Sequence, residues 1–502
     1  MIKKLIGILF FTLSIILNGC VSPDKDGRSI GLINPESQGI SSKAILEFLE
    51  AAERERRDDL HGIIILRHGQ KIAEGYWAPY NAESPHMLFS LSKSFTSSAI
   101  GIAQDEGLLS IYDPVISYFP KEMPDSVSIN LKAMRIKDLL RMTTGHDRDA
   151  TGRMQSGGES WTSNFLSLEV EHLPGTHFVY NTAATYMLSA IVQKASGETL
   201  LQYLKPRLFD PLDIINPTWE VSPEGFNTGG YGLKVRTRDI VSFGQLYLQK
   251  GNWNGKQLIS EAWIDEATSL QTSNGSNPDS DWNQGYGYQF WRCRHNLYRG
   301  DGAFGQYCIV MPQYDAVVAI NSGTNDMQAI MDLVWDHILP AFKDEALPAD
   351  EESYNALKEK LSGLSISTVE GENASSLAES VSNQPYVMKS NETGIVSIKF
   401  DLTSEDKSIT FTSKDESLKI PVGYGSVKQG EMLIPRYGKQ VVASSGAWIS
   451  ESNYRVKMCY YETPFIITFD FIFGDKILTM NADMNVSMAN RRFLELTGEK
   501  VE

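Results

Sequence analysis

The stretch "MLFSLSKSFTSSAIG", Met87 to Gly101, puts a serine and a lysine three residues apart where a helical pattern begins. In a helix the apolar and small side chains that follow, such as Phe95 and Ala99, share one face, which is typical of a buried central helix. Ser90 then lies at the start of this helix and Lys93 nearly one turn later on the same side. The spacing therefore allows the lysine amine to reach the serine hydroxyl.

The start of a helix adds two effects to such a pair. It leaves a free backbone N–H at Ser90 for an oxyanion, and its positive dipole end disfavours the ammonium form of Lys93. A partly neutral amine can accept the serine's proton, so Ser90 is a candidate nucleophile and Lys93 a candidate base. Spacing alone does not decide this, because Ser404 and Lys407 share it. The structural alternative is an N-capping serine beside a solvated lysine.

Two other segments carry residues that fit the same chemistry. "LPGTHFVYNTAATYMLSAIVQKASG" places Tyr180 just before a predicted helix, and "YRGDGAFGQYCIVMP" places a glycine-rich strand end before a resumed strand. With these segments the sequence resembles the serine β-lactamase and penicillin-binding protein superfamily. It is most similar to the class C-like branch, which includes esterases, D-amino-acid peptidases and 6-aminohexanoate-oligomer hydrolases. The resemblance spans residues 33–342.

The resemblance implies a catalytic role for three residues. Ser90 and Lys93 match the family's S-x-x-K motif, and the segment Pro174 to Tyr180 matches its P-G-T-x-x-x-Y context. Ser90 would attack a carbonyl carbon, Lys93 and Tyr180 would exchange protons with it and with the leaving group, and water would release the acyl product. Tyr180 can serve as the base only if Lys93 lowers its pKa from about 10.

Two positions depart from the family's pattern. The second motif is commonly Tyr-x-Asn, but its third residue here is Thr182, and the third motif is commonly Lys-Thr-Gly or His-x-Gly, but here it is Gly300-Asp301-Gly302. The resemblance also places the second oxyanion N–H on Ala303, opposite that of Ser90. The candidate substrate-binding residues are Thr182, Asp301 and Gly302.

Asp301 suggests a preference among substrates. In relatives that use β-lactams or peptides ending in a carboxylate, the cation of the third motif pairs with that carboxylate. Here no cation stands in the motif, an acid occupies its aligned middle position, and Arg299 is expected to point the other way on the strand. Like charges repel, so we expect neutral esters or amides to be preferred over penicillins and cephalosporins. The alternative is that Asp301 only bonds turn amides beside Gly300 and Gly302.

The function we expect is that of a serine hydrolase acting through an acyl-enzyme on ester or amide bonds of small, neutral substrates. One alternative is a β-lactamase or D,D-peptidase acting on cell-wall-type substrates, and another is a non-catalytic binding lipoprotein with a hydrolase-fold scaffold. No cofactor or metal is expected, because the eight histidines form no ligand spacing. A net charge of −16 without a basic stripe argues against nucleic acid as a partner. The oligomeric state stays open.

The N-terminus "MIKKLIGILFFTLSIILNGC" has the pattern of a signal peptide, with two lysines before an apolar run from Leu5 to Leu17. That run is shorter than the roughly 20 residues of a membrane span. The segment resembles the bacterial lipobox, which implies cleavage before Cys20 and lipidation of that cysteine. We therefore expect a lipid-anchored protein of the bacterial cell envelope, facing the periplasm or the exterior. A plain secretory signal with an incidental cysteine is the alternative.

Without Cys20, three cysteines remain in an oxidising compartment, an odd number that leaves at least one thiol unpaired in the monomer. A bridge between Cys293 and Cys308 is conceivable, but no spacing rule supports it. Cys459 is the third.

Beyond the motifs, the chain predicts an α+β domain followed by a β-rich one. "HGIIILRHG" and "KIAEGYW" predict a hairpin, a helix-rich middle includes a helix from Ser90 to about Glu106, and "YGYQFW", "YCIVMP" and "AVVAINSG" predict strands before a closing helix. The resemblance implies a β-lactamase/transpeptidase-like fold, an antiparallel sheet flanked by helices plus a helical subdomain. A charged linker with at most one short solvated helix and a C-terminal all-β barrel or sandwich follow. The expected boundaries are 1–19 for the signal peptide, 20–36 for a tether, 37–342 for the hydrolase domain, 343–373 for the linker and 374–502 for the β-rich domain.

Overall fold

The computed structural model describes residues 32–501, apart from residues 57, 159, 435–436 and 490. The predicted signal peptide, the lipidation of Cys20 and most of the predicted tether lie outside the described residues. Within this described part, no helix is both long and apolar enough to cross a membrane. The chain from Leu32 onward forms one compact unit.

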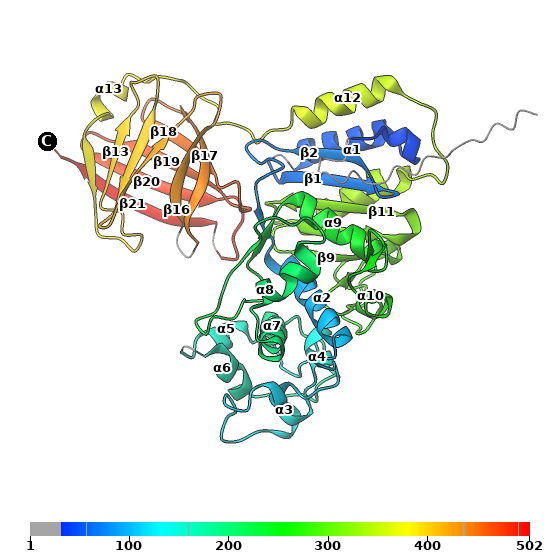
Figure 1. Ribbon diagram of the computed structural model, residues 1–502. Helices are drawn as coiled ribbons and strands as arrows, with labels where there is room; N and C mark the ends of the chain where they lie inside the picture. Colours follow the sequence, from blue (N-terminus) through cyan, green and yellow to red (C-terminus); the bar gives the residue numbers. More distant parts are fainter. Residues whose placement is uncertain (1–31, 57, 159, 435–436, 490, 502) are drawn as a thin grey trace, which may run out of the picture. The chain divides into compact units, whose positions relative to one another are not determined.

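The first sheet has six antiparallel strands in the order β2-β1-β11-β10-β9-β8 (Figure 1). Its strands come from both ends of the first domain, as predicted, and the predicted hairpin is confirmed as β1 and β2. The strands are β1 (Leu60–Arg67), β2 (Gln70–Tyr76), β8 (Trp291–Arg292), β9 (Tyr298–Gly302), β10 (Gln306–Met311) and β11 (Ala316–Ser322).

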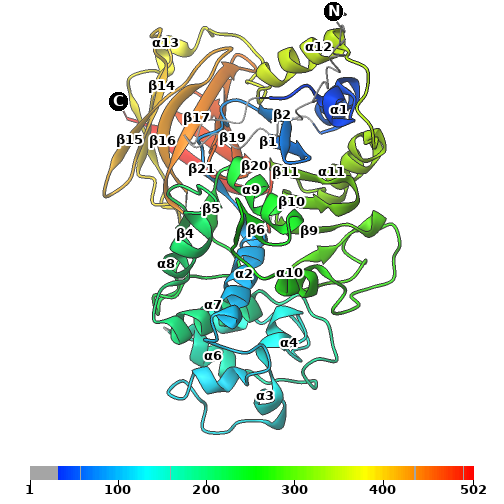
Figure 2. The same ribbon diagram turned by 45° about the vertical axis from the view of Figure 1, so that its right-hand side comes forward.

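Helices cover both faces of this sheet, since β1 is buried along its whole length. Successive side chains of a strand point to opposite faces, so Ile63 packs into one hydrophobic cluster and Ile64 into another. Figures 1 and 2 show the helices on either side of the strands. The first cluster includes α1 (Ser42–Glu55) and α11 (Met327–Leu333), and the second includes α2 (Ser92–Asp105) and α9 (Thr237–Leu248).

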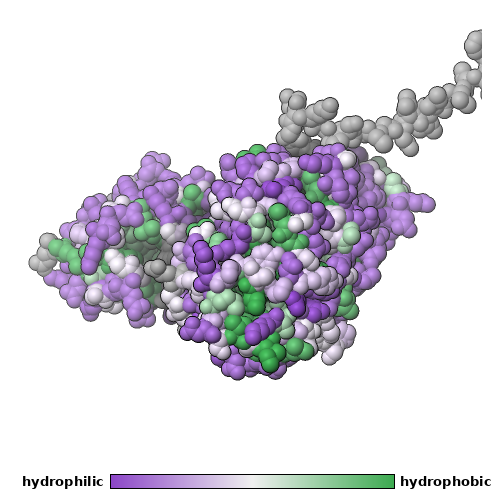
Figure 3. Space-filling model, turned by 60° about the horizontal axis from the view of Figure 1, so that its bottom comes forward, coloured by the Kyte–Doolittle hydropathy of each residue, from purple (hydrophilic) through white to green (hydrophobic). Residues whose placement is uncertain are grey.

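A helical region lies between α2 and α9 in the sequence. Its central helix, α7, ends where Gly197 adopts a positive φ of 76°, as the sequence predicts. Figure 3 turns this end of the molecule forward and shows hydrophobic surface between hydrophilic areas. The helices of the region are α3 (Ile129–Ala133), α4 (Ile136–Leu140), α5 (Thr151–Gln155), α6 (Trp161–Ser167), α7 (Thr182–Ser196) and α8 (Leu200–Leu204). After α9 the chain continues with α10 (Glu261–Thr268). A small sheet is made by β3 (His86–Met87), β4 (Thr218–Trp219) and β5 (Leu233–Val235).

The C-terminal part is one ten-stranded antiparallel sheet that curls into a near-barrel, in the order β15-β14-β13-β12-β21-β20-β19-β18-β17-β16 (Figures 1 and 2). Its two edge strands approach each other, because Gly430 of β16 lies against Pro421 of β15. The predicted all-β domain is confirmed, and five of its strands are among those predicted. The strands are β12 (Pro385–Met388), β13 (Ser397–Asp401), β14 (Ser408–Thr412), β15 (Ser417–Pro421), β16 (Lys428–Ile434), β17 (Gly438–Trp448), β18 (Asn453–Cys459), β19 (Ile466–Phe473), β20 (Ile477–Met484) and β21 (Arg492–Lys500).

The helix in the predicted linker is solvated on one side only. This helix, α12 (Glu351–Ser362), buries Leu357 in the same cluster as α1, and Lys360 pairs with Glu53 of α1. Packing against α1 therefore makes residues 351–362 part of the first domain's surface layer. α1 itself is not among the predicted helices.

The predicted strand "YGYQFW" is also wrong over most of its length, since only Trp291 belongs to a strand, β8. The preceding residues form a turn in which the Gly287 N–H donates to the Phe290 carbonyl oxygen at 2.8 Å. The backbone of Tyr288 bonds the Ala267 carbonyl oxygen instead of a neighbouring strand. The aromatic side chains that suggested a strand are buried in the core for another reason, the packing of this turn against α10.

Candidate active site

Ser90 lies in a short 3-10 turn, Phe89–Leu91, directly before α2, so the helix begins two residues later than predicted. Lys93 is in the first turn of α2. Its Nζ donates hydrogen bonds to Ser90 Oγ at 2.9 Å and to the Gly230 carbonyl oxygen at 2.8 Å. The structure thus brings the predicted nucleophile and base into contact, and Gly230 holds the lysine from a second side.

The amine of Lys93 is poised to exchange a proton. Lys93 is 1% exposed, and this burial lowers the pKa of its amine to about 7, although the negative charges of Asp149 and Asp301 act in the opposite direction. An amine with this pKa is neutral in a large fraction of molecules near neutral pH. It can therefore take the proton of the Ser90 hydroxyl as that oxygen attacks.

Tyr180 joins the same pair, but its electrostatics differ from the expectation. Its hydroxyl interacts with the Ser90 side chain, and the Lys93 Nζ lies 5.0 Å from the centre of its ring. Burial raises the pKa of the Tyr180 hydroxyl well above its ordinary value, and Asp301 raises it further. The condition for Tyr180 to act as a base, a lowered pKa, is not met in the free protein. The geometry favours Lys93 as the base and a protonated Tyr180 as a hydrogen-bond donor.

Glycines of β9 let the turn that carries Ser90 approach the sheet. A Cβ at Gly302 would overlap the Leu88 carbonyl oxygen, and a Cβ at Gly300 would come within 2.5 Å of the Leu91 side chain. Only glycine leaves room for this close approach of two backbones. The predicted third motif therefore lies directly against the predicted nucleophile's turn.

Ala303 lies in the tight turn between β9 and β10, next to this contact. The rings of Phe89 and Phe304, which flank Ser90 and Ala303 in sequence, meet edge to face with centroids 5.3 Å apart. The two candidate oxyanion residues thus belong to turns that are packed against each other. Their role as hydrogen-bond donors to an oxyanion stays a prediction.

Thr182 is the first residue of α7 and borders the Lys93 site. Its backbone N–H donates to Asp149 Oδ1 at 3.2 Å, and its side chain lies against Gly230, which holds Lys93. The preceding Asn181 is buried and caps α7 through its side-chain oxygen. The asparagine that follows Tyr180 here is therefore a structural cap, and the substrate-binding role of Thr182 stays a prediction.

Asp301 is buried and pairs with Arg299, which corrects the expectation that the two side chains diverge. Arg299 Nε donates to Asp301 Oδ2 at 2.9 Å. The two residues are two positions apart on β9, and such residues share one face of a strand. Arg299 neutralises the carboxylate, so the expected repulsion of anionic substrates loses its basis. The alternative, a carboxylate that only bonds turn amides, is also not what the structure shows.

Trp291, which has no role in the sequence prediction, connects this ion pair to Tyr180. Its side chain interacts with that of Asp301, and its ring stacks on that of Tyr180 with centroids 5.1 Å apart. The Arg299 guanidinium lies 5.8 Å from the Trp291 ring. Arg299, Asp301 and Trp291 therefore form the wall on which Tyr180 rests.

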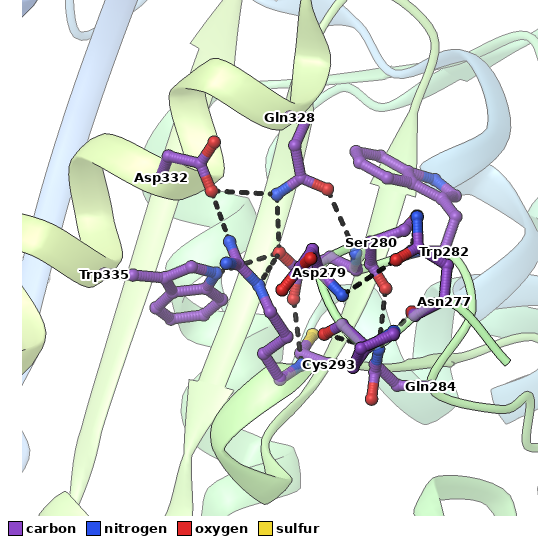
Figure 4. A network of polar contacts seen from close by, with 12 residues as sticks. Asn277, Asp279, Ser280, Trp282, Gln284, Cys293, Gln328, Asp332 and Trp335 are labelled. Atoms are coloured by element: carbon purple, nitrogen blue, oxygen red, sulfur yellow. Dashed lines mark hydrogen bonds and ion pairs between the residues drawn. The ribbon is translucent and has the colours of Figure 1, made fainter.

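A second polar network, shown in Figure 4, is joined to this wall through Arg299. Its centre is the buried carboxylate of Asp281, whose Oδ2 accepts hydrogen bonds from Gln328, Trp335 and Arg294. The backbone carbonyl oxygen of Asp281 accepts a hydrogen bond from Arg299 at 2.8 Å. The network thus fixes the guanidinium that balances Asp301.

The described cysteines do not form a bridge. Cys293, Cys308 and Cys459 are all free and buried, so the conceivable pair of Cys293 and Cys308 is not made. Cys293 Sγ instead accepts a hydrogen bond from Arg299 at 3.2 Å.

Comparisons with known proteins agree with this geometry. Residues 49–340 match the family described as Beta-lactamase. A 6-aminohexanoate-dimer hydrolase of Paenarthrobacter ureafaciens is 25% identical over 276 residues, which cover 51% of this chain and 70% of that protein. A beta-lactamase of Yersinia enterocolitica is 23% identical over 231 residues, 42% of this chain and 55% of that protein.

Among solved structures, a "Putative 6-aminohexanoate-dimer hydrolase" from Bacillus anthracis has a similar fold, with a TM-score of 0.51 and 19% identity. The superposition covers 62% of this chain and 88% of that one. At this identity the likeness concerns the fold.

Proposed function

The chain belongs to the beta-lactamase family, whose members are hydrolases, and from this premise we propose that it cleaves ester or amide bonds through an acyl-enzyme formed on Ser90. One observation carries the proposal. Ser90 Oγ lies 2.9 Å from the amine of Lys93, and burial brings the pKa of that amine to about 7. A hydroxyl beside such an amine can lose its proton as it attacks a carbonyl carbon.

The proposed reaction has two halves. In the first, Ser90 Oγ forms a bond to the carbonyl carbon, its proton moves to Lys93, and the N–H groups of Ser90 and Ala303 bind the oxyanion. The bond to the leaving group then breaks, and that group takes a proton from Lys93 through the Tyr180 hydroxyl, which interacts with the Ser90 side chain. In the second half a water molecule attacks the acyl carbon and gives a proton to Lys93. The bond from that carbon to Ser90 Oγ then breaks, and Ser90 Oγ takes the proton back from Lys93, which releases the acid and restores the free enzyme.

The ion pair of Asp301 and Arg299 changes what we propose about substrates. Because Arg299 balances the charge of Asp301, this carboxylate gives no reason to expect a preference for neutral substrates. We propose small esters and amides as the substrate class. β-Lactams and D-peptides belong in the same test, since relatives of this chain include beta-lactamases.

Labelling with a fluorophosphonate probe tests the proposal. We expect one covalent adduct on the folded full-length protein, located at Ser90 by peptide mass spectrometry, and hydrolysis of at least one member of a panel of esters, linear amides, D-peptides and cephalosporins. Ser90→Ala should abolish both. Absence of labelling in the wild type would instead favour the non-catalytic binding protein.

Ser404→Ala is the matched control. Ser404 and Lys407 repeat the S-x-x-K spacing, but the Lys407 amine bonds Asn373 Oδ1 at 2.8 Å. This variant should label and turn over like the wild type. Labelling at Ser404 with retention of activity in Ser90→Ala would contradict the assignment.

We also propose that the protein is lipid-anchored at the bacterial cell envelope, on the sequence "LNGC" that ends at Cys20. Cys20→Ser should release the protein from membrane fractions or leave it unprocessed. Tight membrane association of that variant would rule out the anchor.

A further inference from the structure

One turn of the near-barrel domain lies against the candidate active site. This docking turn, Tyr460–Phe465, joins β18 to β19, and it is held by its own hydrogen bonds. Thr463 N–H donates to the Tyr460 carbonyl oxygen at 2.8 Å, and Phe465 N–H donates to Thr463 Oγ1 at 3.0 Å. Asn485 of the same domain donates to the Pro464 carbonyl oxygen at 3.0 Å. Hydrogen bonds within the near-barrel domain therefore help to hold the shape of the turn.

The docking turn bonds the segment that leads into Ser90. The Met87 N–H donates to the Glu462 carbonyl oxygen at 3.1 Å, and the Tyr80 hydroxyl donates to the Thr463 carbonyl oxygen at 3.1 Å. Met87 is three residues before Ser90. These contacts join two segments that are almost 400 residues apart in the sequence.

The side chain of Phe465 contacts both turns of the predicted oxyanion hole. Its ring meets that of Phe89 at 6.3 Å and that of Phe304 at 6.0 Å between centroids, both close to edge to face. Phe89 precedes Ser90, and Phe304 follows Ala303. Phe304 is buried in the hydrophobic core of the near-barrel domain, and Phe89 and Ala303 pack against that core. One phenyl ring of the C-terminal domain therefore touches the neighbours of both candidate N–H donors.

Both contacted residues have backbones that need outside support. Phe89 has a φ of 48° and Phe304 a φ of 66°, in the left-handed region that bulky side chains rarely adopt. Such conformations persist only where surrounding structure holds them in place. The three-ring contact with Phe465 supplies packing at this point, from a domain that carries none of the proposed catalytic residues.

We propose that Phe465 is a positioning residue of the active site. By packing on Phe89 and Phe304, it fixes the distance and direction of the Ser90 and Ala303 N–H groups toward the substrate's carbonyl oxygen. The C-terminal domain is thereby a working part of the hydrolase site. This inference rests on the proposed acyl-enzyme mechanism. It adds that the mechanism depends on a residue outside the hydrolase domain.

The test compares Phe465→Leu and Phe465→Ala in the full-length protein. Moving an oxyanion donor should cost less than the roughly 10²–10³-fold in kcat seen when one is removed. We therefore expect the acylation rate constant to fall about tenfold or more in Phe465→Ala and by a smaller factor in Phe465→Leu, which keeps part of the packing. KM should stay within about twofold, because the donors act mainly in the transition state. Stopped-flow acylation by an activated ester and the fluorophosphonate labelling rate measure this directly.

Phe473→Leu and Phe473→Ala are the matched controls. Phe473 lies at the other end of β19, about 26 Å away at the usual rise per strand residue, and is 4% exposed against 6% for Phe465. It contacts Phe400 and Trp448 inside the domain. These variants should lower the melting temperature without changing the acylation rate constant per labelled site.

The outcomes separate the inference from the proposed function. Equal acylation rate constants for the wild type, Phe465→Leu and Phe465→Ala would overturn the positioning role while leaving Ser90 as nucleophile. Equal losses in the Phe465 and Phe473 variants would also overturn it, because the effect would then be one of stability. A wild type that never labels would refute the proposed function itself. If Phe465→Ala does not fold, the comparison of Phe465→Leu with Phe473→Leu decides.

Discussion

Lys93 carries its amine in surroundings that do not favour a charge. Within the described part of the chain, its hydrogen-bond acceptors are two neutral oxygens, Ser90 Oγ and the Gly230 carbonyl. Asp149 and Asp301 act on it only through space. Taking an ammonium group out of water without a paired carboxylate costs free energy, and the group responds by losing its proton more readily. The position of one side chain therefore determines the pH range in which the proposed base can work.

The pH profile of the wild type should show this titration. Burial lowers the pKa of Lys93 to about 7, so roughly a tenth of the molecules have a neutral amine at pH 6 and roughly nine tenths at pH 8. Because the neutral amine is the active form, kcat/KM for an ester that does not titrate should rise about ninefold over this interval and then level off. Lys93→Ala should lose most activity together with this rise. A rate that falls with increasing pH would contradict Lys93 as the base.

Replacing Asp301 by asparagine should affect stability more than charge preference. The change leaves the guanidinium of Arg299, which is 0% exposed, without its counter-charge, and breaking one partner of a buried pair costs about 3–5 kcal/mol. We expect a loss of this size in the free energy of unfolding measured with urea. The ratio of rates on neutral and carboxylate-bearing esters should not change. Asp265→Asn removes an exposed pair with Lys250 and should cost less than about 1 kcal/mol. A changed ratio of these two rates, with an unchanged free energy of unfolding, would instead show that Asp301 repels anionic substrates.

At the level of elements, β9 and the turn before α2 depend on each other. The strand supplies glycines where the turn approaches, and the turn supplies the serine. β9 also carries Arg299 and Asp301 on one face and continues into the turn with Ala303. This short strand and the turn after it therefore contain the third motif, a buried ion pair and one side of the predicted oxyanion hole.

Gly302→Ala should therefore disable the site by displacing its backbone. A Cβ at Gly302 would overlap the Leu88 carbonyl oxygen, so either β9 or the Ser90 turn must move. We expect at least a hundredfold loss in the fluorophosphonate labelling rate, because small displacements of reacting groups are costly in catalysis. Gly152→Ala in α5 is the control, since its Cβ would meet no atom within 4 Å. That variant should label at the wild-type rate, and equal rates for both variants would show that the approach at Gly302 does not matter.

Local patterns in the sequence predict part of these elements and not others. The apolar run in "HGIIILRHG" predicts β1, which is buried along its whole length. The spacing of Ile45, Phe48, Leu49 and Ala52 carries the period of α1, although that helix is not among our predictions. The two-residue spacing of Arg299 and Asp301 already places them on one face of the strand, so their pairing could have been predicted from the sequence. The contact between Phe465 and Phe89 could not be predicted in this way, because no local pattern relates residues that are separated by most of the chain.

At the scale of the whole molecule, a second contact joins the near-barrel to the hydrolase part, away from the docking turn. Lys457 of β18 donates to Asp58 Oδ2 at 2.9 Å, and Ser367 N–H donates to Asp58 Oδ1 at 2.7 Å. Lys457 also donates to the Ser367 carbonyl oxygen at 2.8 Å. Three segments, one before β1, one after α12 and one in the C-terminal sheet, therefore meet at a single carboxylate.

The pH dependence of stability should report this junction. Burial alone would raise the pKa of Asp58, but the charge of Lys457 and the hydrogen bonds from Ser367 outweigh it and hold the pKa below its ordinary value. A lowered pKa in the folded state means that the carboxylate stabilises the fold above the unfolded pKa of about 3.9, and that this contribution is lost as the pH falls through the folded pKa. Asp58→Asn keeps the shape and tolerates the positive φ of 67° at this position. We therefore expect it to lower the free energy of unfolding by about 1.5–3 kcal/mol at pH 7.

The control for this prediction is Asp470→Asn, which removes an ion pair with Arg455 inside the near-barrel sheet, where the Arg455 side chain is 40% exposed and that of Asp470 is 15% exposed. Because this pair lies inside one domain, its loss should not weaken the junction of the three segments. Calorimetric melting from pH 7 down to pH 3 measures both variants against the wild type. The Asp58→Asn deficit should shrink as the pH falls, because the wild-type carboxylate is then protonated as well. A deficit that is the same at pH 3 and pH 7 would mean that the shape of the Asp58 side chain, and not its charge, joins the three segments.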